Sequence, residues 1–374
     1  MKKPQSAISV LIFSLLAFAS GAQKLSPRPV LPVGHLTAGR DMTVARGAHT
    51  ATSLLNFKVL IAGGDGPGFT ILDSTEIYDP TKESFTPAAK LTTPRQGHIA
   101  ALLSDGKVLI AGGGTSGARG ALATSEDYDF ETNTFTPRGS MHARRVRAAV
   151  TVLRDGSPLV TGGTDGTQSL DSAETYSVLT GKWTLVGKMA FPRVSHTSTL
   201  LSDGRVLVVG GVGKDRAVLT SAEIYDPKTK HFTPAGEMHH ARCWHAAALL
   251  TNGKVLIVGG LDYTPRGGSL AMASAELFDP ATHSFTVIGN LAEGRSELPA
   301  PAILLDGRAL VVGGAASAEL FDPIAGTFRT VNGSLDTARN ESAAVQLMDG
   351  SVRIFGGYDS SSHSTAKTWI YRTN

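Results

Sequence analysis

Cysteine is almost absent from this chain, because Cys243 is the only one among 374 residues. A single thiol excludes a framework of intrachain disulfides. An excess of charge of one sign is also missing, since 35 basic residues face 32 acidic ones and leave a formal net charge of +3. Without a strong basic field, the composition does not favour nucleic acid or an anionic membrane surface as a partner.

Long apolar runs are lacking too, apart from one near the N-terminus. The run "ISVLIFSLLAFA" (Ile8–Ala19) has about a dozen residues, short of the ~20 that a membrane-spanning helix needs. Lys2 and Lys3 precede it and small residues follow at Ser20–Ala22, a pattern typical of a secretory signal peptide. We expect residues 1–22 to be removed on export and residues 23–374 to form one soluble domain, either periplasmic or extracellular.

Glycine is abundant, with 42 residues, and much of it recurs in pairs. The pairs are spaced by roughly 50 residues, a period that signals a propeller, a solenoid or an array. They lie at 63–64, 112–113, 162–163, 210–211, 259–260, 313–314 and 356–357.

Each repeat unit has the pattern of short strands rather than of helices. In the fourth unit, β-branched runs such as "RVLVVGG" end at glycines, "SAEIYDP" (Ser221–Pro227) alternates and stops at Asp-Pro, and "HFTPAG" (His231–Gly236) follows. Asp-Gly or Asn-Gly joins two strands in every unit except the first, which has Asn56-Phe57. These dipeptides suit tight hairpin turns, so the pattern predicts four antiparallel strands per unit.

The order of these elements resembles the kelch repeat: an Arg, an inner strand, Gly-Gly, Glu-x-Tyr and an outer aromatic residue. The resemblance covers about residues 33–374 and implies an all-β fold, a seven-bladed β-propeller of four-stranded kelch-type blades. The seventh unit lacks a fourth strand, whereas the chain begins with an unassigned one. We therefore expect residues near Val33–Ala38 to complete the last blade and to close the ring without an open edge.

Residues that recur in every unit are most simply scaffold, so residues that break the repeat are where a site should be sought. A recurring Arg, four residues after Met or Leu, is predicted to pair with the recurring Glu. The alternative is a cationic ring that binds an anion. These positions are Arg46, Arg95, Arg145, Arg193, Arg242, Arg295 and Arg339.

Four histidines lie three residues after this Arg, at His49, His98, His196 and His245. We interpret them as packing residues at the inner strands, with a ring of imidazoles around a transition metal as the alternative.

The repeats are also similar to the propeller of galactose oxidase, a copper-radical enzyme. That resemblance places His245 in register with a copper histidine of the family, but the adjacent tyrosine is Trp244 here. The family cross-links a cysteine to a second tyrosine, and only Cys243, Tyr263 and Tyr358 are candidates outside the scaffold. The full constellation is not visible, so we expect no metal, no cofactor and no catalytic residues.

Loops between Gly-Gly and the Glu strand vary most in length. The fifth unit has the longest, Leu261–Ala273, and the sixth has the shortest, which predicts a cleft between blades five and six. Tyr263 offers a flat amphipathic ring and Arg266 a planar donor fork, and Trp244 is expected at the base of this loop. The predicted ligand-binding residues are Trp244, His245, Tyr263, Arg266 and Tyr358.

The sequence thus predicts an exported, monomeric binding or interaction module with a protein or glycan ligand on its loop-rich face. A galactose-oxidase-like or sugar-modifying enzyme on the same propeller is the alternative. If Tyr263, Tyr358, Cys243 and His245 do not converge, the metal-radical alternative fails.

Overall fold

The computed structural model describes residues 31–116, 120–263 and 268–373. Residues 33–374 form one compact unit, which holds all the strands found among the described residues. The export signal expected over residues 1–22 lies outside the described residues. No helix in the described part of the chain is long and apolar enough to cross a membrane.

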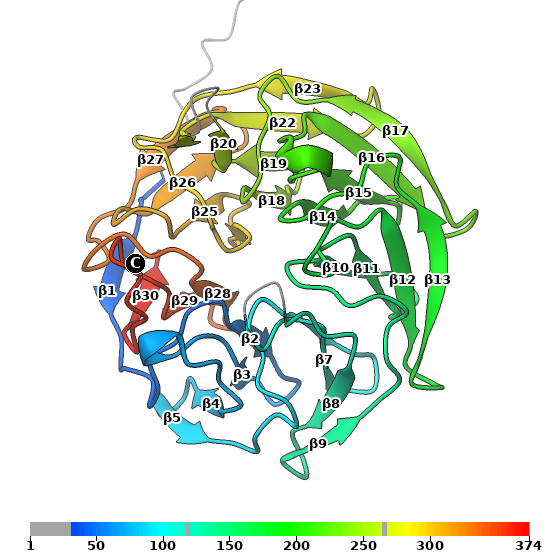
Figure 1. Cartoon of the computed structure of the whole chain (residues 1–374). Coiled ribbons are helices and arrows are strands. Elements are labelled where there is room, and N and C mark those ends of the chain that lie inside the picture. The colour runs from blue at the N-terminus through cyan, green and yellow to red at the C-terminus, as the bar shows by residue number, and fades with distance from the viewer. Residues whose placement is uncertain (1–30, 117–119, 264–267, 374) are drawn as a thin grey trace, which may run out of the picture. The chain divides into compact units, whose positions relative to one another are not determined.

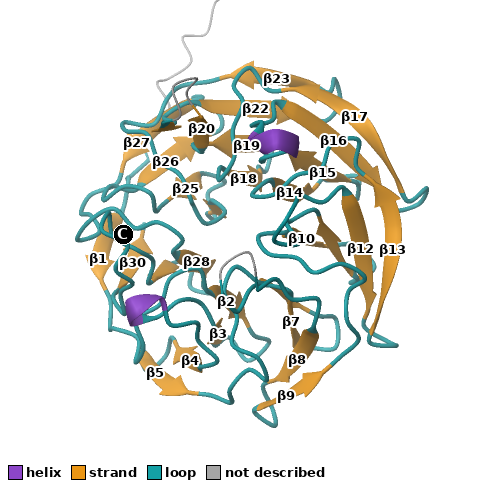
Figure 2. Ribbon diagram, viewed as in Figure 1, coloured by secondary structure: helices purple, strands orange, loops and turns teal. Residues whose placement is uncertain are grey.

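Seven four-stranded antiparallel sheets follow one another around a central axis (Figures 1 and 2). In the first six sheets the strands run outward from the axis in chain order. This arrangement confirms the predicted all-β, seven-bladed propeller. Two short 3₁₀ helices, η1 (Pro67–Phe69) and η2 (Lys214–Arg216), lie in loops of blades one and four.

The strand bounds follow the predicted repeat closely. Blade one comprises β2 (Thr50–Ser53), β3 (Val59–Ala62), β4 (Thr75–Asp79) and β5 (Ser84–Pro87). Blade two comprises β6 (Ile99–Leu102), β7 (Val108–Ala111), β8 (Ser125–Asp129) and β9 (Thr134–Pro137). Blade three comprises β10 (Ala149–Val152), β11 (Pro158–Thr161), β12 (Ser172–Ser177) and β13 (Lys182–Lys188). Blade four comprises β14 (Thr197–Leu200), β15 (Val206–Val209), β16 (Ser221–Asp226) and β17 (His231–Glu237). Blade five comprises β18 (Ala246–Leu249), β19 (Val255–Val258), β22 (Ala275–Asp279) and β23 (Ser284–Val287).

Blade six comprises β24 (Ala302–Ile303), β25 (Ala309–Val311), β26 (Glu319–Asp322) and β27 (Thr327–Thr330). Blade seven comprises β28 (Ala343–Gln346), β29 (Val352–Phe355), β30 (Thr368–Arg372) and β1 (His35–Ala38). An extra hairpin, β20 (Leu261–Tyr263) and β21 (Ser269–Ala271), forms a separate two-stranded sheet in the long loop of blade five.

The core lies between neighbouring blades, and the second strand of each blade is its most buried part. All four residues of β3 are at most 1% exposed, because both faces of this strand are covered by adjacent sheets. Leu159 of blade three shares one apolar cluster with Val206 and Val208 of blade four. Strands buried on both faces read as unbroken apolar runs, which explains "VLIA" and "VLVV" in the sequence.

The Gly-Gly pairs end these strands for a steric reason. Gly64 has a φ of +93°, and a Cβ atom there would lie 2.4 Å from the carbonyl oxygen of Gly47. A side chain at this position would therefore be strained and would also collide with the backbone of the inner-strand entry.

The recurring Arg and Glu pair within each blade, as predicted. In blade one, Arg46 Nη2 lies 2.9 Å from Glu76 Oε1, and neither side chain is more than 1% exposed. The same pair occurs in blades two to six with N–O distances of 2.7–3.1 Å. Blade seven has no such Glu, and Arg339 instead lies 2.8 Å from Asp336. The Arg residues are therefore scaffold, because a buried charge needs a partner.

Ring closure is confirmed. The N-terminal strand β1 pairs antiparallel with β30, from His35 opposite Arg372 to Ala38 opposite Trp369. Leu36 is 4% exposed and packs in the apolar cluster of the last blades together with Trp369 and Tyr371. The two ends of the propeller unit thus complete a single sheet, in which β1 is the outer strand and covers the edge of β30.

Candidate functional site

Where the chain enters the inner strand of each blade, one residue from every blade joins a closed circle of backbone hydrogen bonds. Each of these residues donates its N–H to the carbonyl oxygen of its counterpart in the preceding blade, over 2.9–3.3 Å. Each has a positive φ of 48–58°. We call this set the mouth ring, and its members are Ala48, Gly97, Arg147, Ser195, Trp244, Glu297 and Glu341.

A positive φ is unfavourable for residues with a side chain, typically by about 1 kcal/mol or more. Six of the seven members of the mouth ring carry one. The circle of hydrogen bonds holds the backbone in this conformation and fixes the direction of each side chain. The mouth ring is therefore a rigid frame that carries seven independently variable side chains at the channel entrance.

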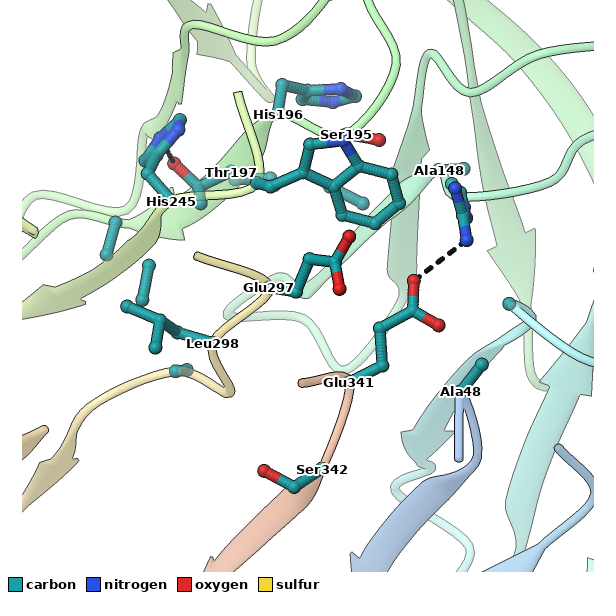
Figure 3. A pocket seen from close by; sticks show the side chains of 18 of the residues that line it. Ala48, Ala148, Ser195, His196, Thr197, His245, Glu297, Leu298, Glu341 and Ser342 are labelled. Atoms are coloured by element: carbon teal, nitrogen blue, oxygen red, sulfur yellow. Dashed lines mark hydrogen bonds and ion pairs between the residues drawn. The ribbon is translucent and has the colours of Figure 1, made fainter. Parts of the chain in front are cut away.

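Charged and aromatic side chains of the mouth ring contact one another across blades. Arg147 Nη2 donates to Glu341 Oε1 over 2.8 Å, and the dashed line in Figure 3 marks this contact. The guanidinium carbon of Arg147 lies 4.1 Å from the centre of the Trp244 ring, a cation–π distance. Figure 3 shows Glu297 and Glu341 reaching into the same pocket from neighbouring blades.

A cavity of about 390 Å³ lies in the channel beneath this ring. Its walls are the mouth ring and the residues that follow it on each inner strand, including His49, His196, His245 and Ser342. Three charged side chains reach it, namely Arg147, Glu297 and Glu341. With both carboxylates ionised, these three groups carry one net negative charge.

Burial and, to a smaller extent, the nearby Glu341 raise the pKa of Glu297 to about 7, against the opposing effect of Arg147. Burial also raises the pKa of Glu341, against the attraction of Arg147. Two carboxylates that share a confined space disfavour each other's ionised form. Perturbed acids of this kind cluster at functional sites, which makes Glu297 a candidate functional group.

A second cavity, of about 650 Å³, lies beside the first and shares Arg147, Ser195 and Trp244 with it. Its other walls include Gln96, Thr164, Arg216 and Tyr263. Arg147 and Arg216 are the charged residues that line it, so this cavity is basic whereas the channel cavity is acidic.

The structure brings some of the predicted site residues together. Trp244 and Tyr263 line the second cavity, and Trp244 and His245 line the channel cavity. Tyr358 lines neither; its hydroxyl donates to Asp65 Oδ2 over 2.7 Å. Arg266 lies outside the described residues. Ligand binding by these residues stays a prediction.

The position of the cavity differs from the expected one. Trp244 and Tyr263 share a cavity with residues of blades two to four, whereas a cleft between blades five and six was expected. The reason is that β20 and β21 form a hairpin on which Tyr263 lines the same cavity as Arg216 of blade four. Loop length indicated the residue but not the direction of its loop.

Arg147, Glu297 and Glu341 were not predicted. A signal for them exists, since the position two residues after the recurring Arg reads Ala, Gly, Arg, Ser, Trp, Glu and Glu along the chain. No other column this close to the inner strand mixes both charges with an aromatic residue. Comparing units column by column, instead of by loop length, would have found them.

The four inner-strand histidines are buried at 5–7% exposure. Burial lowers the pKa of each, so they are neutral near pH 7. Three of them bond a threonine hydroxyl through Nε2 over 2.8–2.9 Å: His98 to Thr50, His196 to Thr161 and His245 to Thr197. Within residues 31–116, 120–263 and 268–373, no three His, Cys, Asp or Glu side chains are placed to hold a metal ion.

The residues of the copper-radical alternative do not form a metal site in the described structure. Cys243 is fully buried, its thiol donates to the Leu261 carbonyl oxygen over 3.5 Å, and burial raises its pKa to about 12. His245 bonds Thr197, and Tyr358 bonds Asp65 on the far side of the ring, in the loop of blade one. These side chains do not fit the copper set that the galactose oxidase resemblance implies.

Comparisons with known proteins agree with this architecture. Two solved structures are similar: a "Novel fungal alcohol oxidase with catalytic diversity among the AA5 family, in complex with copper" (19% identity, TM-score 0.72, 91% of this chain and 76% of that one) and the "Structure of YjhT" (12% identity, TM-score 0.61, 89% and 96%). At these identities the likeness shows the fold alone. No curated protein sequence matches this chain.

A family model, the KLHDC2/KLHL20/DRC7 Kelch-repeats domain, matches residues 48–260. The matched region covers more than half of the chain and runs from the mouth-ring residue Ala48 to the second glycine of the fifth Gly-Gly pair, Gly260. Together with the blade architecture, this match establishes that the chain belongs to the kelch-repeat family of β-propellers.

Proposed function

We propose that this chain is an exported binding module that holds a segment of a partner protein at the mouth of its channel. The observation that best supports this proposal is the mouth ring, a closed and rigid circle of residues whose side chains differ from blade to blade. Kelch propellers are commonly protein-interaction modules, and export is supported by the signal-like residues 1–22.

The charges of the two cavities favour a peptide over a neutral glycan. The channel cavity is lined by Glu297 and Glu341, whereas the second cavity is lined by Arg147 and Arg216. A peptide presents cationic, anionic and aromatic groups along one chain and can satisfy both cavities at once. Trp244 lies on their shared wall and supplies a large rigid surface of the kind that dominates binding energy at interfaces.

An array of short peptides, acetylated and amidated at their ends, tests this proposal beside a glycan array. Purified protein should bind a reproducible subset of peptides. Trp244→Ala combined with Tyr263→Ala should abolish that binding without lowering the melting temperature by more than about 2 °C, because Tyr263 is 45% exposed and the scaffold ion pairs are untouched. The matched control is Leu179→Ala, which removes an exposed apolar side chain on the β12–β13 turn.

Binding to glycans but not to peptides would replace the partner with a carbohydrate. Binding to neither, or full binding by the double variant, would contradict the proposal.

A second candidate is acid–base catalysis on a carbohydrate, the sugar-modifying alternative. One observation favours it: Glu297 has a pKa of about 7, which suits a group that must both take up and release a proton at neutral pH. Incubation with mixed oligosaccharides, followed by NMR, should then reveal a product that Glu297→Gln does not form. Absence of turnover in the wild type would remove this candidate.

A further inference from the structure

Several polar atoms of the channel cavity and its rim have no partner among the described residues, and the carboxylate and amide oxygens among them are acceptors. No described donor reaches the Glu297 carboxylate, and Arg147 occupies only one oxygen of Glu341. Asp65 Oδ1 and Gln96 Oε1, close to the rim, are buried and unpaired as well. A ligand that completes this site must therefore bring hydrogen-bond donors.

Two further unpaired residues of the channel cavity, His49 and Ser342, lie at the boundary between blades one and seven. His49 and Ser342 are each 7% exposed and line the channel cavity, and neither ring nitrogen of His49 nor the Ser342 hydroxyl has a partner. Burying a polar group without a hydrogen-bond partner is unfavourable, because the group loses its contacts with water.

The repeat shows why this boundary differs. His98 and His245 are bonded by the threonine that follows the preceding histidine, Thr50 or Thr197. The residue that would serve His49 is Ala343, which has no hydroxyl. The boundary between blades seven and one thus lacks this scaffold hydrogen bond, and His49 and Ser342, which line the cavity, are left without a partner.

The charges in the channel cavity also favour a cationic ligand. Arg147 is committed to Glu341 and to the face of Trp244. Among the described residues, Glu297 is then the acid in the channel cavity that lacks an ion-pair partner. A ligand that supplies one positive charge would neutralise the cavity, whereas an anionic ligand would add to its negative charge.

Resting on the proposed function, we infer that the channel mouth is a receptor for a primary ammonium group of the bound peptide, paired with Glu297 in the cavity that Ser342 and His49 also line. An ammonium group has three donors and no acceptor, which matches the carboxylate of Glu297. It is also compact enough to enter a cavity of about 390 Å³. A lysine side chain and a free peptide N-terminus both supply this group.

The state of Glu297 gives the site a dependence on pH. The charged or titratable groups that act on or near it are Arg147 (before β10), Glu341 (before β28), and Cys243 and Tyr263 of blade five. The channel histidines are neutral because burial lowers the pKa of each. Glu297, with a pKa of about 7, changes its charge between about pH 6 and about pH 8, and an ammonium should bind more tightly as it ionises.

Calorimetric titration with three peptides tests the inference: acetyl-Gly-Lys-Gly-amide, acetyl-Gly-norleucine-Gly-amide, and the norleucine peptide with a free amino terminus. At about pH 8 the lysine peptide should bind at least about tenfold more tightly than the acetylated norleucine peptide, the expected size for one hydrogen-bonded charge pair. At about pH 6 its affinity should fall by about tenfold. Comparison with the free-amine peptide decides which source of ammonium is preferred.

Glu297→Gln keeps the shape of the side chain and should erase both the preference and its pH dependence. Glu131→Gln, at an exposed acid on the β8–β9 turn, should retain them. Equal affinities for the lysine and acetylated norleucine peptides, an unchanged preference in Glu297→Gln, or no binding of either amine up to about 10 mM would each overturn the inference. The peptide array tests the proposed function separately from this titration. Peptide binding on the array without a preference for lysine would therefore overturn only the inference about the ammonium group.

Discussion

Replacing Glu297 by Gln should remove a pH dependence of stability that the wild type has. The carboxyl has a folded-state pKa of about 7, against an ordinary value of 4.5. An acid whose pKa is raised on folding holds its proton longer in the folded state than in the unfolded chain. Its contribution to stability is therefore fully present below about pH 4.5 and is lost as the pH rises to about 7.

The size of this loss follows from the shift. About 2.5 pKa units at about 1.4 kcal/mol per unit give on the order of 3 kcal/mol. For a unit of roughly 340 residues, an unfolding entropy of about 2.1 cal/mol/K per residue converts this to a difference of about 4 °C in melting temperature. Glutamine does not ionise, so Glu297→Gln should gain this much relative to wild type between about pH 5 and about pH 8.

Differential scanning fluorimetry of both proteins across this pH range measures the effect as a difference of two curves. Other acids with raised pKa values, including Asp65 and Glu341, are present in both proteins and largely cancel. Glu131→Gln serves as the control at an exposed position. If the wild-type and Glu297→Gln curves run parallel from about pH 5 to about pH 8, folding does not raise the pKa of Glu297 and the reasoning fails.

Three further outcomes are expected. Deleting residues 23–40 removes β1 and should cost about 2–5 kcal/mol, because an edge and the apolar face under Leu36 become exposed; an unchanged denaturation midpoint would contradict ring closure. Arg193→Met should destabilise the protein by about 3–5 kcal/mol by leaving Glu223 buried without its partner, and adding Glu223→Gln should restore part of that loss in chemical denaturation. Elemental analysis and intact mass should show no stoichiometric copper and no Cys–Tyr cross-link, because Cys243 and His245 are buried with other partners; one copper per chain would reverse this expectation.

Most of the fold could be predicted because its determinants recur seven times within the chain. Gly-Gly pairs mark the ends of the buried strands, and a side chain there would collide with backbone, as at Gly64. The unpaired first strand and the incomplete last unit predicted the pairing of β1 with β30. Such signals are local in sequence, so one chain suffices to identify them.

The site was harder to predict because its contacts cross blades. Arg147 and Glu341 are 194 residues apart and meet only because the ring closes. Loop length drew attention to Tyr263, which lines a cavity, but the direction of the β20–β21 hairpin depends on packing that no local pattern encodes. Even so, the mouth-ring position holds a different kind of residue in most repeat units, and this difference is visible in the sequence. In other propellers, each repeat position can be compared across the units in the same way.

The central claim is that ligand recognition takes place at the mouth ring and not elsewhere on the propeller. A lysine peptide that carries a photoactivatable diazirine beside the lysine tests it most directly, with the cross-linked residues identified by mass spectrometry. The account predicts cross-links on the entry loops and the β20–β21 hairpin, at or near Arg147, Trp244 and Tyr263. Cross-links concentrated at the turns on the opposite face, where Leu305 and Met348 are exposed, would contradict it.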